Sequence, residues 1–193
     1  MAGVRNEVFD IRGINHLALV CKDMARTVDF YTNVLGMPLI KTIDFPDGAG
    51  QHFFFDVGNG DALAFFWFPG APEAQPGVSS AANPPLAGPI LSAHGSMNHV
   101  AFNIPAEKFD EYCAKLEARG VKCTRVLNHN DEDPQTTIDA VTASTFVRSV
   151  YFQDPDGILL EFACWIRALD PATDALVAPR NAEGMARVLE PAE

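Results

Sequence analysis

Apolar and polar positions alternate over a short stretch that occurs twice in the chain. Residues 14–20 read Ile-Asn-His-Leu-Ala-Leu-Val and residues 97–103 read Met-Asn-His-Val-Ala-Phe-Asn, with the two histidines 99 − 16 = 83 positions apart. Period-2 alternation with aliphatic residues predicts a β-strand in each case. Because alternate side chains of a strand share a face, His16 and His99 each lie on the face of the Ala two positions later. We expect the two strands to form matching walls of one cavity.

The pattern after the first of these strands predicts a complete small unit. Apolar residues at helical spacing predict a helix at 23–36, which Asp23 would cap at its start and Gly36 would end. Turn-rich segments then separate short apolar runs that are typical of strands. The unit therefore reads β-α-β-β-β, with strands at 14–20, 38–45, 51–57 and 62–68.

The second unit repeats this order with one insertion. We expect strands at 97–103, 121–127, 146–153 and 158–165 around a helix at 106–119. The polar, acidic stretch 128–145 has no counterpart in the first unit, and long loops beside a site are often lids. We therefore expect this loop to border the cavity and to become better ordered with ligand.

These elements predict an α+β fold built from two βαβββ modules in tandem. The first module with its lead-in covers residues 1–68, and the second covers 97–165. Pro and Gly are frequent in 69–96, which we interpret as a linker without a core of its own. The tail, 166–193, has little periodicity, so a short helix and an unstructured tail are both open.

Composition narrows the class of protein. Hydrophobic residues make up 48% of the 193 residues and charged residues 20%, which is typical of a globular protein with a sizeable core. The formal charge of −11 argues against nucleic-acid and anionic-membrane partners, which attract clustered Lys and Arg. No apolar run reaches transmembrane length and the first residues lack a signal-peptide pattern, so we expect a cytoplasmic protein. The four cysteines lack zinc-type spacing and are most simply buried apolar residues.

Glu161 is the one charged residue in an otherwise apolar run at 158–165. A buried carboxylate without a partner would destabilise the fold or take up a proton. A divalent cation held by Glu161 and the repeated His16 and His99 would resolve this conflict. Taken singly, a strand His is more often a core or surface residue and a strand Glu often faces water, but the repeat makes these three a coherent set. Aligning the last strands of the two units puts Phe65 opposite Glu161.

Two further motifs make a resemblance to a known family specific. The first helix ends in Phe30-Tyr31-x-x-x-Leu35-Gly36, and the last hairpin reads Asp154-Pro155-Asp156-Gly157-x-x-x-Glu161-Phe162. With a His opening each βαβββ unit, the chain resembles the vicinal oxygen chelate superfamily over about residues 14–165. That superfamily includes glyoxalase I, extradiol ring-cleaving dioxygenases, methylmalonyl-CoA epimerase, fosfomycin-resistance enzymes and bleomycin-binding proteins.

The resemblance implies mixed sheets that curl round a cleft, with one metal ion held by His16, His99 and Glu161. Glyoxalase I has a fourth ligand, a Glu on the last strand of its first unit, where this chain has the apolar run 62–68 with Phe65. The resemblance therefore argues against glyoxalase I proper. Two His and one carboxylate leave positions open for a bidentate substrate and O₂, as in non-haem Fe(II) oxygenases.

The dioxygenase signature, aliphatic-Tyr-x-x-Asp-Pro-x-Gly-x-x-x-Glu, matches residues 150–161 throughout. The signature also requires a His a few residues upstream, where this chain has Thr-Ala-Ser-Thr at 142–145. Tyr151 is a candidate catalytic hydrogen-bond donor, with a core aromatic as the alternative. His94, just before the second metal strand, is a candidate acid or base, or a loop residue without a role. His129, among acidic and amide neighbours, reads as a solvated loop residue.

Three function classes remain open at this point. The leading hypothesis is an enzyme with one divalent metal ion that dioxygenates a small substrate chelated through vicinal oxygens; Fe(II) is the first choice, and Mn, Ni, Co or Zn the alternatives. The second is a redox-neutral isomerase, epimerase or epoxide-opening enzyme in which the metal acts as a Lewis acid. The third is a metal-free protein that sequesters a drug or metabolite. A homodimer is compatible with all three, and the sequence does not name the substrate.

Overall fold

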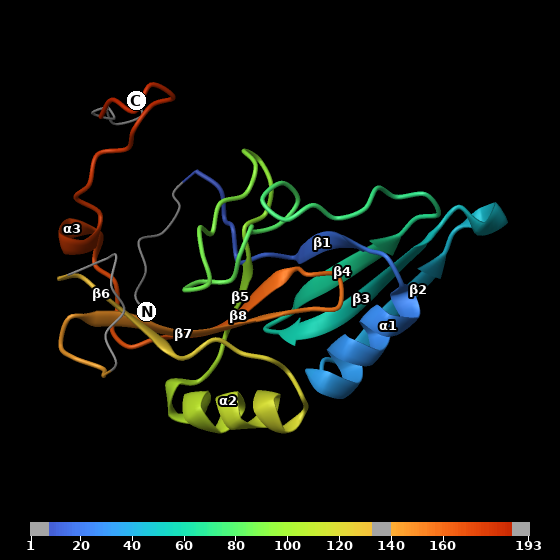
Figure 1. Ribbon diagram of the computed structural model, residues 1–193, viewed down its shortest axis with the longest axis horizontal. Helices are drawn as coiled ribbons and strands as arrows, with labels where there is room; N and C mark the ends of the chain where they lie inside the picture. The colour runs from blue at the N-terminus through green and yellow to red at the C-terminus, as the bar shows by residue number, and fades with distance from the viewer. Residues whose placement is uncertain (1–7, 133–139, 187–193) are drawn as a thin grey trace.

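The computed structural model describes residues 8–132 and 140–186. Two four-stranded mixed sheets form its centre, in the orders β1-β4-β3-β2 and β5-β8-β7-β6 (Figure 1). In each sheet the first strand of the module runs parallel to the last, and the other neighbours are antiparallel. The expected α+β fold of two tandem βαβββ modules is confirmed. The strands are β1 (His16–Cys21), β2 (Leu39–Asp44), β3 (Gln51–Gly58), β4 (Asp61–Trp67), β5 (Val100–Asn103), β6 (Leu127–Asn130), β7 (Thr145–Gln153) and β8 (Leu159–Trp165).

The helix of the first module begins and ends where the sequence predicts. α1 (Met24–Asp29) follows Asp23, whose carboxylate accepts a hydrogen bond from the Arg26 N–H at 3.0 Å and so caps the helix. The helix continues as a π-helical turn at Phe30–Val34, a widening that helical periodicity did not predict. Gly36 then adopts a φ of 77°, the left-handed conformation that Gly tolerates best.

The second module differs from its prediction at its second strand. A 3₁₀ turn at Ala106–Lys108 leads into α2 (Phe109–Ala118), but the strand expected at 121–127 is wrong in position, because β6 spans Leu127–Asn130. Thr124 explains the shift. Its N–H donates to the Tyr151 carbonyl at 2.8 Å, yet the Tyr151 N–H donates to the Thr124 hydroxyl at 3.1 Å. A side chain thus replaces a backbone partner, and the regular ladder with β7 starts only at β6.

Part of the predicted 128–145 loop is therefore strand, at β6 and at the first residue of β7. Residues 133–139 lie outside the described residues. The role of this segment as a lid stays a prediction. In the tail, the described residues contain one short helix, α3 (Pro171–Asp174).

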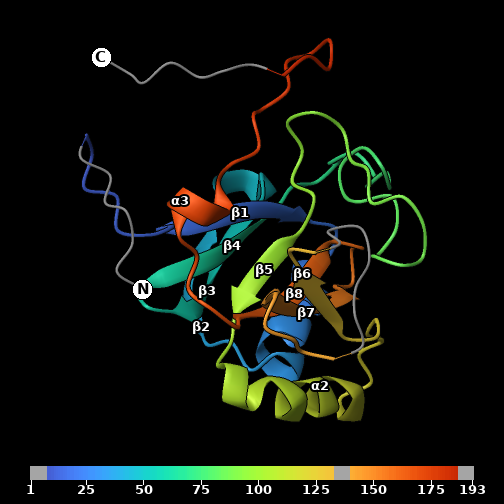
Figure 2. The ribbon, with the colours of Figure 1, turned by 90° about the vertical axis from the view of Figure 1, so that its left-hand side faces the viewer.

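A shared core joins the two modules. Buried side chains from both sheets and both long helices form one cluster, and α1 and α2 lie on the same side of the sheets (Figures 1 and 2). Tyr31 is fully buried, and its hydroxyl donates to Asp154 at 3.2 Å in the hairpin turn before β8. The Lys22 N–H donates to Asp156 in the same turn at 3.0 Å. The helix face of each sheet is therefore covered within the chain.

The linker packs over the opposite face of the second sheet. Most of residues 69–96 is irregular, but Ser80 and Ala81 are buried. Ala81 forms a small apolar cluster with Leu127, Tyr151 and Leu159. The linker thus shields part of the face that carries Glu161. None of the helices in the described residues is long and apolar enough to cross a membrane.

Candidate metal site on the second sheet

Strand register places His99 and Glu161 on one face of the second sheet. β5 and β8 are parallel neighbours with Ala101 opposite Glu161, and His99 precedes Ala101 by two residues. The His99 Nε2 lies 3.1 Å from the Glu161 Oε2. The Glu161 side chain is 6% exposed and that of His99 is 35% exposed. The pair is therefore open to solvent on the imidazole side only.

Asn98 fixes the orientation of the imidazole. Its Nδ2 donates to the Ile90 carbonyl at 2.6 Å, which leaves its Oδ1 to accept from the His99 Nδ1 at 2.9 Å. The proton on Nδ1 leaves the Nε2 lone pair facing the carboxylate of Glu161. Two acceptors in contact require a proton or a cation between them. An imidazole nitrogen and a carboxylate oxygen are both ordinary ligands of Fe, Mn and Zn, so these residues fit a divalent metal ion.

Polar neighbours keep the Glu161 carboxylate charged. Burial alone would raise its pKa, but interactions with His99, Ser149 and Tyr151 outweigh burial and lower it. The Ser149 hydroxyl is buried and has no hydrogen bond of normal geometry among the described residues. The Ser149 hydroxyl, which lies beside the Glu161 carboxylate, can therefore form a hydrogen bond with a ligand bound at this site.

Tyr151 lies where the sequence predicts a catalytic donor. It pairs with Glu161 across β7 and β8, and its ring centroid is 5.7 Å from that of His99. Burial, followed by the charge of Glu161, raises the pKa of its phenol. The hydroxyl therefore stays protonated at neutral pH and can donate a hydrogen bond to a ligand beside His99.

His16 occupies the equivalent position in the first sheet, but it forms no group with His99 and Glu161 that could hold a metal ion among the described residues. Its Nδ1 lies 2.8 Å from the Asn15 Oδ1, and its ring packs 5.6 Å from Phe54. Within residues 8–132 and 140–186, no three His, Cys, Asp or Glu side chains lie close enough to hold a metal ion together. The three-residue site of His16, His99 and Glu161 thus stays a prediction. His94 is exposed in the turn before β5, and its role also stays a prediction.

The prediction that Phe65 occupies the position of the missing fourth ligand is wrong. Phe65 is fully buried on the helix side of the sheet, with its ring 4.9 Å from that of Tyr31. Ala64 pairs with Ala18 in the first sheet as Glu161 pairs with Ala101 in the second. Ala64 is therefore the counterpart of Glu161. The predicted alignment slipped by one residue, which sends a strand side chain to the opposite face.

Aromatic rings replace the acid on this face of the first sheet. His52 stacks on Phe66 with ring centroids 3.6 Å apart and lies 4.3 Å from Phe54. Burial, and then the nearby His16, lower the pKa of His52. Its Nε2 is buried and has no partner among the described residues. The first sheet thus offers the imidazoles of His16 and His52 and an apolar wall.

His129 is a residue that the sequence interpretation missed. The prediction of a solvated loop residue is wrong, because His129 lies on β6 and is half-buried. It pairs with Val147, which places it on the face of Ser149 and Tyr151. Burial lowers its pKa, opposed by the charge of Glu161. The alternation of Leu127 and His129 could have identified this strand, but the surrounding acidic residues obscured it.

Comparison with known proteins agrees with this architecture. Residues 13–162 match the family model of the Glyoxalase/Bleomycin resistance protein/Dioxygenase superfamily. The putative ring-cleaving dioxygenase MhqE of Bacillus subtilis is 28% identical over 113 residues, which are 56% of this chain and 32% of that protein. The metallothiol transferase FosB of Lysinibacillus sphaericus is 26% identical over 152 residues, 79% of this chain and 82% of that protein.

A solved structure supports the fold independently of sequence. The glyoxalase family protein from Enterococcus faecalis superposes with a TM-score of 0.54 at 21% identity, covering 79% of this chain and 97% of the other. The chain spans about a third of the length of MhqE and of Saccharomyces cerevisiae glyoxalase I, so the activities of those whole proteins do not transfer with the match. On the family match alone, the chain belongs to the Glyoxalase/Bleomycin resistance protein/Dioxygenase superfamily.

Proposed function

We propose that this chain is a metal-dependent enzyme that binds a small substrate through two adjacent oxygen atoms. One divalent metal ion is held by His99, Glu161 and His16. The observation that carries this proposal is the contact of the His99 Nε2 with the Glu161 carboxylate, because two facing acceptors need a proton or a cation between them.

We further propose Fe(II)-dependent dioxygenation as the reaction. The first module has Ala64 at the position that corresponds to Glu161, so it supplies no second carboxylate. The metal would then have two imidazole ligands and one carboxylate ligand from the protein, which leaves coordination positions open for substrate and O₂. The likeness to MhqE, named as a putative ring-cleaving dioxygenase, supports this choice. When bound, the metal would supply Lewis acidity and a place for O₂ beside the substrate.

The protein side chains position and polarise the substrate. Tyr151 donates a hydrogen bond from a phenol that remains protonated. His129 lies on the same face, and its lowered pKa keeps it neutral and able to accept a proton at neutral pH. Phe54 and Phe66 give the first sheet an apolar wall suited to an aromatic or aliphatic substrate body.

His16 reaches the pair either from the first sheet of the same chain or from a second copy in a homodimer. Complementation separates the two arrangements. A mixture of His16→Ala and Glu161→Ala chains can assemble one complete site per dimer if the site is shared between copies. Recovery of roughly a quarter of the wild-type metal binding and activity would assign the shared site, because random mixing makes half of the dimers mixed and each mixed dimer has one complete site out of two. No recovery would assign the site to one chain.

Metal analysis of protein purified without oxygen tests the proposed function. We expect about one iron per intact site, oxygen uptake with catechols, whose two hydroxyls are adjacent, and loss of both in Glu161→Gln. Exposed Glu107→Gln is the matched control and should leave both unchanged. An apoprotein that gains no thermal stability from Fe(II), Mn(II), Ni(II), Co(II) or Zn(II) would overturn the metal site.

A redox-neutral reaction is the second candidate. The sequence match to FosB extends over a larger share of both proteins than the match to MhqE does. In that case Mn, Ni, Co or Zn would support transfer or isomerisation without oxygen uptake. The same metal titration therefore distinguishes the two, since turnover under anaerobic conditions with a non-redox metal excludes the dioxygenase.

A further inference from the structure

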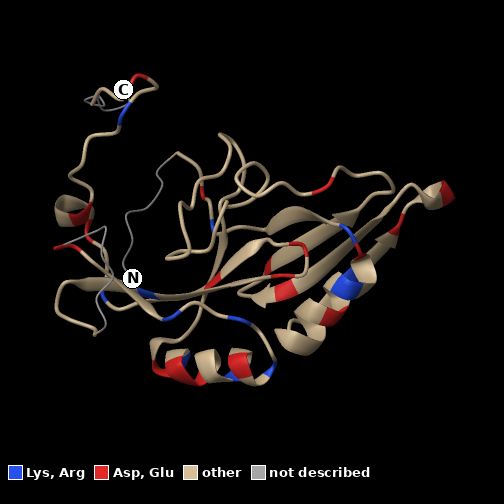
Figure 3. Ribbon diagram, viewed as in Figure 1, with Lys and Arg blue, Asp and Glu red and all other residues tan. Residues whose placement is uncertain are grey.

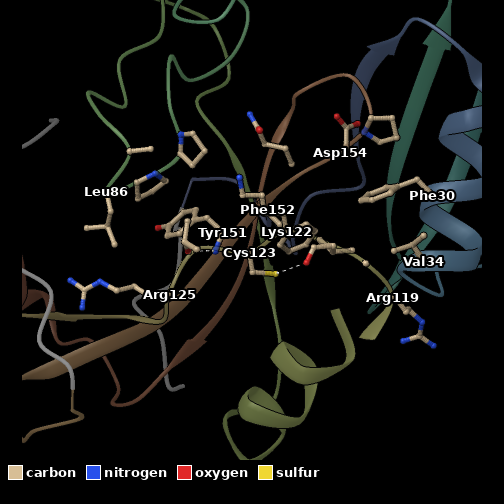
Figure 4. Close-up of a pocket in the computed structure, with 18 of the residues that line it drawn as sticks. Phe30, Val34, Leu86, Arg119, Lys122, Cys123, Arg125, Tyr151, Phe152 and Asp154 are labelled. Carbon is tan, nitrogen blue, oxygen red and sulfur yellow. Dashed lines mark hydrogen bonds between the residues drawn. The ribbon is translucent and has the colours of Figure 1, made fainter. Parts of the chain in front are cut away.

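A large cavity lies outside the candidate metal site, between the modules and the linker. Its volume is about 820 Å³. Four segments form its walls: the α1 helix with its π-helical turn, linker residues 84–87, residues 119–125 after α2, and residues 151–155 at the end of β7 and in the following turn (Figure 4). Of the residues on the metal-site face, only Tyr151 and Gln153 reach it. The cavity is therefore separate from His99 and Glu161.

The cavity has an apolar body. Phe30 and Val34 line it from the first module, Phe152 from the second sheet, and Leu86 from the linker (Figure 4). Leu86 is 57% exposed and has a φ of 70°, a conformation that costs a non-Gly residue about 1–3 kcal/mol. An exposed apolar side chain held in a strained conformation at a cavity mouth is a feature more typical of binding sites than of plain loops.

Cations surround this apolar body. Arg26, Arg119, Lys122 and Arg125 all line the cavity, although the chain as a whole has 14 Lys and Arg against 25 Asp and Glu. Figure 3 shows basic positions on α1 and on the segment after α2, and both segments line the cavity. Arg26, Arg119 and Lys122 form no ion pair among the described residues. By contrast, ion pairs among the described residues are formed by the cations Arg12, Lys22, Lys108, Lys115, Arg148 and Arg167.

The single carboxylate of the cavity wall does not neutralise these cations. Asp154 is 6% exposed, and its oxygens accept hydrogen bonds from the Tyr31 hydroxyl and from the N–H groups of Asp156 and Ile158. It is thus turned into the protein. The rim of the cavity keeps a net positive charge on a strongly acidic chain.

We propose that this cavity binds an amphipathic anion, with an apolar body against Phe30, Val34 and Leu86 and a carboxylate or phosphate head among Arg26, Arg119 and Lys122. The volume is within the range of small-molecule sites, and an apolar pocket with a few polar groups is their usual arrangement. Guanidinium groups favour planar, doubly hydrogen-bonded anions such as these. The site contains none of the proposed metal ligands, and Tyr151 is the one proposed reaction residue in its wall.

Binding of matched amphiphiles tests the site on the full chain without any activity assay. Decanoate, decyl phosphate and decyltrimethylammonium share one apolar chain and differ in the head group. We expect either or both anions to bind at least about 10-fold more tightly than the cation, with backbone amide shifts confined to residues 26–34, 86–87, 119–125 and 151–154, which line the cavity. A preference between decanoate and decyl phosphate identifies the head group. Equal binding of anion and cation would overturn the proposal.

Two variants locate the interaction on this cavity. Arg119→Glu with Lys122→Glu should weaken anion binding at least about 10-fold, whereas Lys41→Glu with Arg180→Glu changes the net charge equally away from the cavity and should leave it unchanged. Leu86→Gly removes the apolar cover and the strained conformation together, so it should weaken binding without loss of thermal stability. Equal effects of the two charge-reversal pairs, or unchanged binding in Leu86→Gly, would contradict the site.

Discussion

The two modules present a histidine in the same way and differ in what faces it. In both, an Asn immediately before the His contacts the imidazole Nδ1, at 2.8 Å for Asn15 and 2.9 Å for Asn98. The last strand then places Ala64 on this face in the first module and Glu161 in the second. Both modules thus orient the imidazole in the same way, but only the second module has an acid, Glu161, at the facing position. One module supplies charge, and the other supplies an imidazole and an apolar wall.

The largest expected effect tests which face of β4 belongs to the core. Phe65→Ala should destabilise the protein by about 3–5 kcal/mol, because it leaves a cavity beside Tyr31 in the shared core. Phe66→Ala, on the opposite, half-buried face, should cost clearly less. Urea unfolding of both variants measures the difference. Equal losses would mean that the two faces of the first sheet are not distinguished as described.

The hairpin turns before the last strands give the second test. Only the second module has a buried acid there, Asp154, and burial raises its pKa to about 6 from 3.8. A raised pKa means that the folded state holds the proton more tightly, so the contribution to stability is complete below about pH 3.8 and is lost as the pH rises through 6. Relative to Asp154→Asn, the wild type should gain about 3 kcal/mol between pH 7.5 and pH 3. A pH-independent difference in chemical unfolding would contradict the raised pKa.

Removal of the acid from the second module should make its face resemble that of the first. Glu161→Gln should weaken Fe(II) or Mn(II) affinity at least about 100-fold, since even outer-shell changes at metal sites cost 10–100-fold. Isothermal titration of the anaerobic apoprotein measures this. Retained affinity in the variant would show that the metal binds elsewhere.

Addition of an acid to the first module is the converse change and has the smallest expected effect. Ala64→Glu should tighten metal binding about 10-fold by adding a fourth ligand near His16, and should hinder substrates that need the open position. The isosteric Ala64→Gln controls for size. If both variants bind metal as the wild type does, Ala64 does not lie beside the site.

Local signals in the sequence predicted much of this molecule, and long-range pairing accounts for the errors. The cap at Asp23, the left-handed Gly36 and the Asn-His strands follow from neighbouring residues, and the structure confirms them. The side of the sheet on which Phe65 points depends on register with β1, more than 40 residues away in sequence, so a one-residue slip could not be detected. The position of β6 depends on a side-chain hydrogen bond at Thr124, which strand periodicity does not encode.

The cavity escaped prediction for the same reason. Its cations come from α1 and from the segment after α2, and no run of basic residues marks them in the sequence. Only the packing of one module against the other, through Tyr31 and Asp154, brings these segments together.

The parallel pairing of first and last strands also constrains the order of events on the ribosome. β1 cannot pair with β4 until its partner 62 − 16 = 46 residues later has been synthesised, and β5 waits 160 − 100 = 60 residues for β8. Such distant contacts form late and slowly. His99 and Glu161 therefore meet only after the last strand has left the exit tunnel. Until then the nascent second module has an unpaired β5 edge, which is exposed to incorrect pairing with other strands.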